Sequence, residues 1–238
     1  LWPLMRRSSR VHLQGWGEPL LNPAFFDMAA LVRKAGCQVS TTTCGLRMDA
    51  KLALEIVKSG IDIVAFSLAG TDAASNASRK GVDFDRVCEA VSALQRVRRD
   101  LMGVRLESHF AYLMLAATIE AVAGLPPLMQ RLGVHAAVIS TLDYIPESGL
   151  EVEAIRPQET DKLARAVAIL AETAAEARRL GMGFHYELPS TAATGKTCRE
   201  NISRCLFISA DGWVSPCVYV NLPAEVEHFG AERQEPHG

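Results

Sequence analysis

The sequence has no long hydrophobic run, few aromatic residues and almost no excess of charge of either sign. No stretch approaches roughly eighteen consecutive apolar residues, which excludes an α-helix that spans a bilayer. The formal net charge of −2 gives no reason to expect nucleic acid or an anionic membrane surface as a partner. The opening LWPLMRRSSR is too short and ends too basic for a signal peptide, so the expected compartment is the cytoplasm.

The chain nevertheless contains enough apolar material for a sizeable core. Its 238 residues, 49% of them hydrophobic, suit one large α/β domain or one domain with a small appendage. The first residue is Leu1 rather than Met. We therefore expect a fragment, or a gene product that has lost its natural beginning.

Stretches with strand character alternate with amphipathic stretches over the first 180 residues. Expected strands lie at 11–15, 38–42, 61–68, 104–115 and 134–142, and the last expected helix lies at 159–180. This repeat, at roughly 30-residue spacing, indicates parallel βαβ units. An open doubly wound sheet and a curved partial barrel both fit, because spacing does not reveal strand order.

The first expected strand ends in a glycine-rich corner. Gly15-Trp16-Gly17 lets the backbone turn and lie open, because glycine has no Cβ to block an approaching ligand. Glu18-Pro19 follows, and Asn22-Pro23 is typical of a helix start, with Asn22 as the N-cap. In α/β proteins ligands bind at such carboxyl ends of strands. An ordinary tight turn with a solvated Glu18 is the alternative interpretation.

Three of the six cysteines lie near the end of the chain, at Cys198, Cys205 and Cys217. The segment Ala210-Asp211-Gly212 between them predicts a tight hairpin, which would bring the flanking thiols together. Three cysteines suit a soft metal but do not close a four-coordinate site. Iron–sulfur ligation, structural zinc and unliganded thiols therefore stay open at this point.

Period two along the fourth expected strand puts Arg105, Glu107 and His109 on one face. Ionisable groups on a buried strand are costly unless they are paired or face a wet cavity. The interior of a barrel near its mouth, meaning the carboxyl ends of its strands, satisfies that need. An edge strand with a solvated face is the alternative.

The segment QGWGEPL followed by Asn-Pro resembles the glycine-rich segment after the second strand of radical S-adenosylmethionine (SAM) enzymes. More narrowly, it resembles the radical SAM/SPASM maturases associated with tungsten-containing oxidoreductases. The resemblance covers roughly residues 11–223. It implies a partial (β/α)6 TIM-like barrel that lacks its first strand here, over residues 1–182, followed by an incomplete SPASM-like iron–sulfur segment over residues 183–238.

The resemblance also implies roles for particular residues. The backbone of Gly15, Trp16, Gly17 and Glu18 would bind the methionine end of SAM, and three further residues would line the same pocket: Thr43, Ser67 and Arg79. Ser67 would contact the carboxylate or ribose, and Arg79 would pair with a carboxylate. An exposed loop arginine is the alternative for Arg79.

The segment from Cys198 to Cys217 resembles the opening of a SPASM domain, which holds auxiliary [4Fe–4S] clusters. Cys198 and Cys217 match the family's ligand spacing, and Cys205 is a further candidate. No later cysteine follows, so this chain would ligate the cluster incompletely. The Cys-x3-Cys-x2-Cys loop that radical SAM catalysis needs is also absent from the sequence.

The resemblance implies that an intact relative cleaves SAM reductively to a 5′-deoxyadenosyl radical for peptide or cofactor maturation. The expected partners are SAM and a peptide or protein substrate. This chain alone is expected to be inactive. The rival hypothesis is a non-catalytic α/β scaffold that binds a metal or a partner.

Overall fold

The computed structural model describes residues 1–101, 103–142, 144–145, 149–188, 202–221 and 227–228. Its centre is a six-stranded parallel sheet in the order β1-β2-β3-β4-β5-β7. These strands are β1 (Arg10–His12), β2 (Gln38–Thr43), β3 (Ile63–Leu68), β4 (Glu107–Met114), β5 (Ala136–Thr141) and β7 (Gly183–Tyr186). The order follows the chain without the reversal that defines a doubly wound sheet. Right-handed crossovers in such a sheet place the connecting helices on one face.

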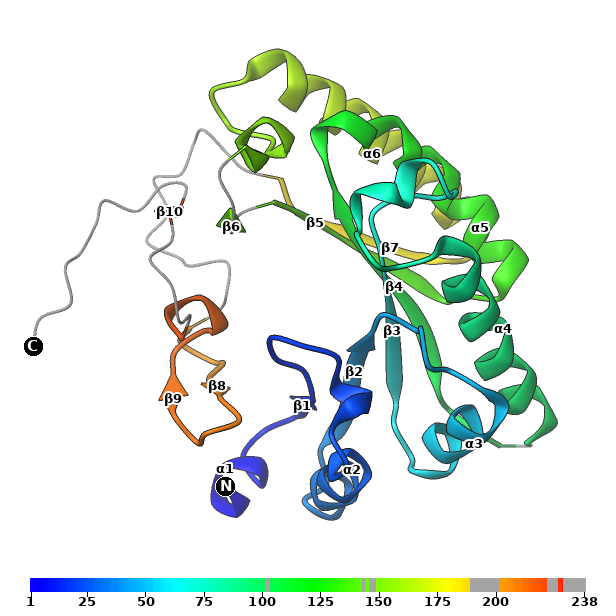
Figure 1. Ribbon diagram of the computed structural model, residues 1–238, viewed down its shortest axis with the longest axis vertical. Helices are drawn as coiled ribbons and strands as arrows, with labels where there is room; N and C mark the ends of the chain where they lie inside the picture. The colour runs from blue at the N-terminus through cyan, green and yellow to red at the C-terminus, as the bar shows by residue number, and fades with distance from the viewer. Residues whose placement is uncertain (102, 143, 146–148, 189–201, 222–226, 229–238) are drawn as a thin grey trace, which may run out of the picture.

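Figure 1 shows the helices from α2 to α6 lined up on the outer face of the curved sheet, and none of these described helices covers its other face. The helical segments are α2 (Phe25–Lys34), α3 (Ala50–Lys58), α4 (Phe84–Asp100), η3 (Ala116–Gly124), α5 (Leu125–Leu132) and α6 (Thr160–Arg179). This arrangement confirms the predicted partial barrel and rules out the doubly wound alternative. None of the helices in the described ranges is long and apolar enough to cross a membrane.

The remaining elements are short. They are α1 (Trp2–Met5), η1 (Pro19–Leu21), η2 (Ser75–Ser78), β6 (Tyr144–Ile145), η4 (Leu150–Glu153), β8 (Phe207–Ile208), β9 (Val214–Ser215), η5 (Val218–Val220) and β10 (Glu227–His228). Strands β6 and β10 pair antiparallel, as do β8 and β9.

Local sequence signals explain where α3 and α4 begin. Asp49 and Asp83 cap α3 and α4, because their carboxylates accept the backbone N–H groups of Leu52 and Arg86. The expected start of α2 at Pro23 is wrong by two residues. Asn22 accepts the N–H of Ala24 in a turn that precedes the helix, and α2 begins at Phe25.

The core lies between the sheet and the outer helices. Alternate residues of β4 are buried, among them Phe110 and Tyr112, which are at most 1% exposed. The outer helices cover them with buried side chains such as Leu94 of α4 and Met129 of α5. Burial of alternate strand residues on one face is what a barrel wall with helices outside requires.

The other residues of β4, including Glu107 and His109, lie on the concave face of the sheet, which is the face turned away from the helices. Strand β4 lies inside the sheet, so the edge-strand alternative is wrong. The expected position near the mouth is also wrong. Glu107 is the first residue of β4, which puts the pair toward the amino ends of the strands.

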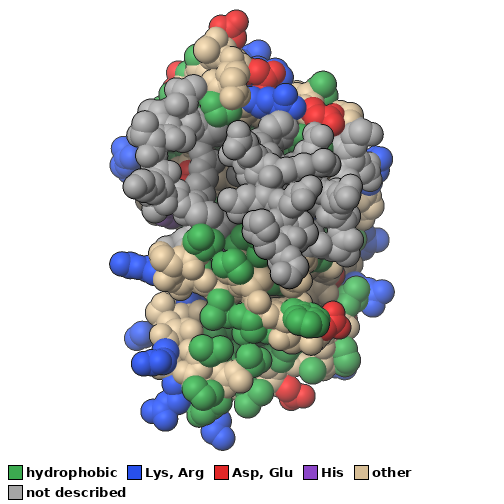
Figure 2. Space-filling view, turned by 90° about the vertical axis from the view of Figure 1, so that its left-hand side faces the viewer, with side chains coloured by type: hydrophobic (Ala, Val, Ile, Leu, Met, Phe, Trp, Pro, Cys, Tyr) green, Lys and Arg blue, Asp and Glu red, His purple; other side chains and the backbone are tan. Residues whose placement is uncertain are grey.

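The predicted C-terminal hairpin is present. Strands β8 and β9 pair through Phe207↔Ser215 and Ile208↔Val214, and Gly212 adopts φ +84° in the turn between them. Figure 2 shows the side of the molecule on which α1 and the hairpin lie in Figure 1, and hydrophobic side chains gather in its lower half. On the hairpin, Trp213 is 73% exposed.

Candidate functional site

The glycine corner lies immediately after β1, at the mouth of the half-barrel. A Cβ placed on Gly15 or Gly17 would meet no atom within 4 Å, and neither residue has a positive φ. Packing within the chain therefore does not explain glycine at these positions. The corner leaves its backbone open to solvent, as an approaching ligand would need. Trp16 between them is 54% exposed.

Glu18 ties the corner to the end of β2. Its Oε1 accepts the hydroxyl of Thr43 at 2.8 Å and the N–H of Leu20 at 3.3 Å, while its Oε2 accepts the N–H of Cys44 at 2.7 Å. A carboxylate engaged by three donors of its own chain holds two loops together. This fixes where the carbonyls of the corner point.

Thr43 supports that contact rather than facing the open mouth. Its side chain is buried, and its hydroxyl donates to Glu18 and accepts the N–H of Gly45 at 3.0 Å. Both functions of the hydroxyl are thus used inside the protein. Next to it, burial and the adjacent Glu18 carboxylate raise the pKa of the half-buried Cys44 thiol.

Ser67 and Arg79 bring polar groups to the carboxyl end of β3. Ser67 is half-buried on the concave face, and its hydroxyl has no hydrogen bond within the described residues. Arg79 is half-buried, which overturns the exposed-loop alternative. Its Nε is buried without a partner, and it makes no ion pair with any described residue. Burial lowers the pKa of Arg79, and its charge lies close enough to interact with that of Cys44.

A compact turn fixes the loop that carries Arg79. The side-chain oxygen of the buried Asn76 accepts the N–H of Ala69 at 2.9 Å, and the hydroxyl of Thr71 donates to the carbonyl of Ala121 at 2.9 Å. Gly70 packs directly against this turn, since a Cβ there would lie 2.2 Å from the backbone of Ser75 and Asn76.

Of the three predicted metal ligands, two lie within the described residues. Cys198 lies outside the described residues, Cys205 is exposed and Cys217 is half-buried. Continuing the β8–β9 register outward by two residues sets Cys205 against Cys217. The described part of the chain contains no group of three or more metal-ligating side chains placed to hold an ion. The auxiliary cluster therefore stays a prediction.

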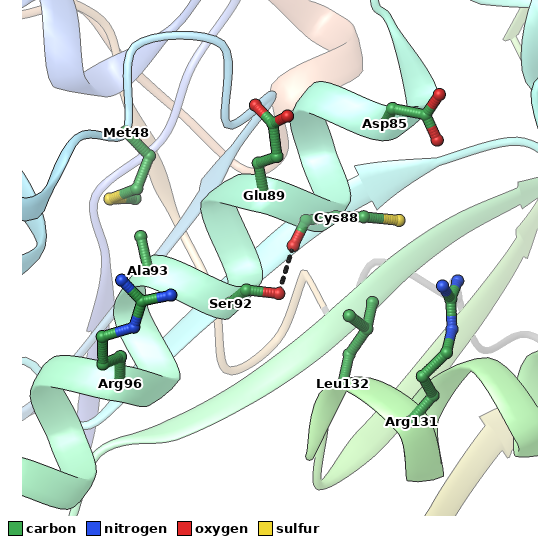
Figure 3. A pocket seen from close by; sticks show the side chains of 9 residues that line it. All are labelled: Met48, Asp85, Cys88, Glu89, Ser92, Ala93, Arg96, Arg131 and Leu132. Carbon is green, nitrogen blue, oxygen red and sulfur yellow. Dashed lines mark hydrogen bonds between the residues drawn. The ribbon is translucent and has the colours of Figure 1, made fainter.

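A groove of about 520 Å³ lies on the outer helices, and none of the predicted site residues lines it. Figure 3 shows the side chains that line this groove. The groove lies between α4 and α5, and its lining includes Cys88, Arg96 and Arg131. Burial raises the pKa of Cys88. Size alone does not make this groove the functional site, because none of the residues predicted to bind a ligand lines it.

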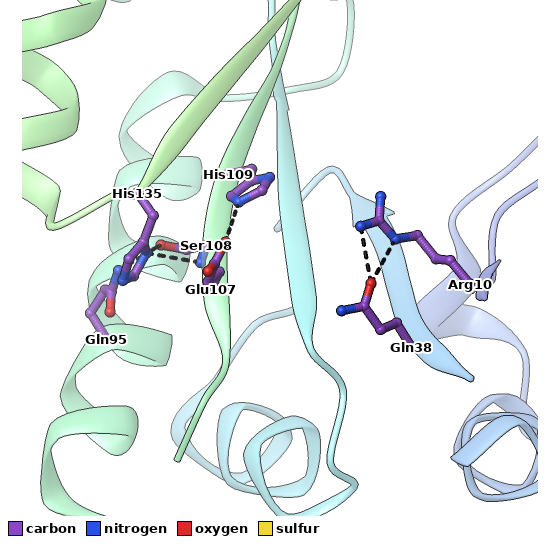
Figure 4. A network of polar contacts seen from close by, with 7 residues as sticks. All are labelled: Arg10, Gln38, Gln95, Glu107, Ser108, His109 and His135. Carbon is purple, nitrogen blue, oxygen red and sulfur yellow. Dashed lines mark hydrogen bonds and ion pairs between the residues drawn. The ribbon is translucent and has the colours of Figure 1, made fainter. Parts of the chain in front are cut away.

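A polar network that sequence reasoning missed joins α4, β4 and β5 near the amino ends of the strands (Figure 4). Gln95 donates to the hydroxyl of the buried Ser108 at 2.6 Å and to the carbonyl of Gly133. Nδ1 of His135 accepts the backbone N–H of Ser108 at 3.2 Å. Gln95 is the one polar residue on the otherwise apolar buried side of α4. A polar residue at such a position indicates a buried hydrogen-bond partner, and this was the sequence signal for the network.

The His135 contact links stability to pH. Burial, and then the charge of Arg98, lower the pKa of His135 below its ordinary value of 6.5. The pKa of His135 is lower in the folded state than in the unfolded state. The neutral His135 side chain therefore contributes to the free energy of unfolding above about pH 6.5, and this contribution is lost as the pH falls below that value.

We therefore expect the free energy of unfolding to decrease on acidification from about pH 7.5 to about pH 5.5, and to decrease less in His135→Gln. Urea unfolding at the two pH values measures this. His185→Gln, at an exposed position on β7, is the matched control and should keep the wild-type pH dependence. An equal pH dependence in wild type and His135→Gln would contradict the assignment.

Comparison with known proteins matches the first part of this half-barrel to a described family. Residues 4–112 match the family model described as the Radical SAM superfamily, which identifies a radical SAM domain there and confirms the predicted resemblance. The "Tungsten-containing aldehyde ferredoxin oxidoreductase cofactor-modifying protein" of Pyrococcus furiosus is 26% identical over 234 residues. That alignment covers 94% of this chain but 61% of the relative, so the chain spans less than two thirds of the relative's length.

Solved structures share the fold at low sequence identity. SuiB of Streptococcus suis superposes with a TM-score of 0.67 at 13% identity, covering 95% of this chain and 56% of SuiB. SuiB bound to S-adenosylmethionine gives a TM-score of 0.65 at 14% identity, over 92% of this chain and 51% of SuiB. The anSMEcpe structure with bound AdoMet gives 0.57 at 17% identity, over 74% and 49% of the two chains.

Proposed function

We propose that the mouth formed by β1, β2 and β3 binds S-adenosylmethionine, with the methionine end of SAM on the glycine corner. Several acceptors are needed at once to bind an ammonium group, and an open backbone supplies them. The observation that carries the proposal is the placement of Gly15–Gly17 after β1, and of Ser67 and Arg79 at the end of β3 and in the loop that follows it, with β2 between the two strands. The domain match and the SAM-bound structural neighbours support it.

The half-buried Arg79 supplies the charge that a carboxylate of SAM would need. A guanidinium without an ion pair among the described residues is costly to bury, and a bidentate carboxylate offsets that cost. Glu18 and Thr43 take supporting roles in this proposal. They position the corner while the backbone makes the contact.

We propose that the whole protein uses SAM, with an iron–sulfur cluster, to mature a peptide or a cofactor. SuiB has been solved with a precursor peptide, and the Pyrococcus furiosus relative bears the name of a cofactor-modifying protein. We further propose a radical SAM core followed by a SPASM-like segment with Cys198, Cys205 and Cys217. Strand β7 adds Gly183–Tyr186 to the core sheet, just beyond the expected boundary at residue 182. Because the sequence lacks the Cys-x3-Cys-x2-Cys loop, we expect no SAM cleavage by this chain alone.

Calorimetric titration with SAM tests the proposed binding. Wild-type protein should bind SAM saturably, and Arg79→Gln should weaken binding at least about tenfold, because it loses the charge-assisted bonds to the carboxylate. Methylthioadenosine, which lacks the amino and carboxylate groups, should bind more weakly and be insensitive to the substitution. Arg86→Gln, on the exposed side of α4, is the matched control and should bind as wild type does. Equal SAM affinity in wild type and Arg79→Gln would contradict this assignment.

A further inference from the structure

The concave face of the half-barrel carries a hydrogen-bonded glutamate–histidine pair that the SAM site does not use. Nε2 of His109 lies 3.0 Å from Oε2 of Glu107, two residues earlier on β4 (Figure 4). The His109 side chain is 16% exposed, whereas the Glu107 side chain is 54% exposed. The carboxylate therefore orients the imidazole and keeps acceptor capacity toward the interior of the half-barrel.

Small residues lie beside His109, whereas Ile63 on β3 lies beside Glu107. In the sheet register His109 lies beside Ala65 on β3 and Ala136 on β5, and Gly183 follows on β7. One step toward the mouth, Ala111 lies beside Ser67. Ala65 on β3 and Ala111 on β4 are half-buried and carry only a methyl group each, whereas Ala136 is buried. Among the described residues, Ala65 and Ala111 leave room above the concave face, and we call these two residues the alanine floor.

The alanine floor connects the Glu107–His109 pair to the proposed SAM site. Ser67 is in register with Ala111, so His109 is its diagonal neighbour on the adjacent strand, about 7–8 Å away between Cα atoms. Glu107 lies one further step toward the amino ends of the strands. An elongated group that enters at the mouth can thus pass Ser67, lie over the floor and end at Glu107.

We propose that this surface is the substrate side of the chamber and binds a primary ammonium group carried on an aliphatic chain; the role as substrate site rests on the proposed function. The aliphatic stem would lie over the alanine floor, as long cationic side chains lie over apolar surfaces elsewhere. The ammonium would donate to the free acceptor positions of Glu107, and the Glu107–His109 bond would hold the carboxylate in place. This is a positioning role, which fixes the distance between substrate and SAM.

Pentylammonium and 1-pentanol are the probes, because they match in length and differ in charge. Ring ¹H–¹⁵N signals of His109 followed during titration should shift saturably with pentylammonium and at least tenfold more weakly with 1-pentanol. Glu107→Gln should weaken pentylammonium binding at least tenfold. Glu89→Gln, an exposed carboxylate on α4, is the matched control and should not change it.

The failures of the two proposals can be told apart. If pentylammonium and 1-pentanol bind equally, or if Glu107→Gln binds pentylammonium as wild type does, the inference is overturned even when SAM binds normally. If SAM fails to bind while the pentylammonium response persists, the proposed function fails and the ammonium site stands. Unchanged SAM affinity in Glu107→Gln shows that the variant is folded.

Discussion

Gly70→Ala is expected to destabilise the protein by about 4 kcal/mol, or to prevent folding, because its Cβ would lie 2.2 Å from backbone atoms of Ser75 and Asn76. Those atoms belong to the turn that fixes the Arg79 loop and cannot move as a flexible side chain would. Urea unfolding followed by circular dichroism measures the effect.

Gly15→Ala is the matched control, since the same methyl group would meet no atom within 4 Å there. We expect its free energy of unfolding to stay within about 0.5 kcal/mol of wild type. Comparable stability of the Gly70→Ala and Gly15→Ala proteins would show that the turn at Gly70 is looser than described. Comparing the two variants distinguishes a glycine that is needed for packing, Gly70, from one that is proposed to be needed for a ligand, Gly15.

Glu18→Ala is expected to weaken SAM binding about a hundredfold and to lower the free energy of unfolding by about 2 kcal/mol. The substitution removes the acceptor for Thr43, Cys44 and Leu20, which releases the corner from β2. Calorimetry with SAM and urea unfolding measure the two effects separately.

Asp49→Ala is the control for the Glu18 experiment. Asp49 also accepts a backbone N–H in front of a helix, but it caps α3, and in the described part of the chain it forms no hydrogen bond or ion pair with residues 15–18. We expect a loss of about 1 kcal/mol in stability with SAM affinity unchanged. If Glu18→Ala binds SAM as tightly as Asp49→Ala does, Glu18 does not position the corner.

The fold was largely predictable because its signals are local. The buried run before Leu68, the capping aspartates and the Asp211-Gly212 turn each specify an element through nearby chemistry. Strand β7 was missed because Gly183–Tyr186 is short, and its last two residues are exposed at the edge of the sheet. Its pairing with β5 is a tertiary contact, and no local sequence pattern predicts it.

The residues of the candidate site could be named from the sequence as a proposal, but the contacts among their side chains could not. The sequence predicts that the backbone of Glu18 and the side chain of Thr43 line the ligand pocket, but it does not predict that the Glu18 carboxylate and the Thr43 hydroxyl are engaged with one another and with nearby backbone. The sequence also predicts Glu107 and His109 near the mouth, which is wrong. Period two along a strand tells which face a residue lies on, but how far a residue lies from the mouth depends on the register between strands. Hydrogen-bond partners and strand register depend on which segments pack together in the folded chain, so a local sequence pattern does not predict them.

Hydrogen–deuterium exchange with and without SAM tests the central claim most directly, because it locates binding along the chain. The account predicts slower exchange on SAM addition in peptides that cover residues 14–18, the end of β3 at Ser67 and the loop that ends at Arg79. Peptides that line the outer groove between α4 and α5 should be unaffected. SAM-dependent protection of that outer groove, with residues 14–18 unchanged, would contradict the account.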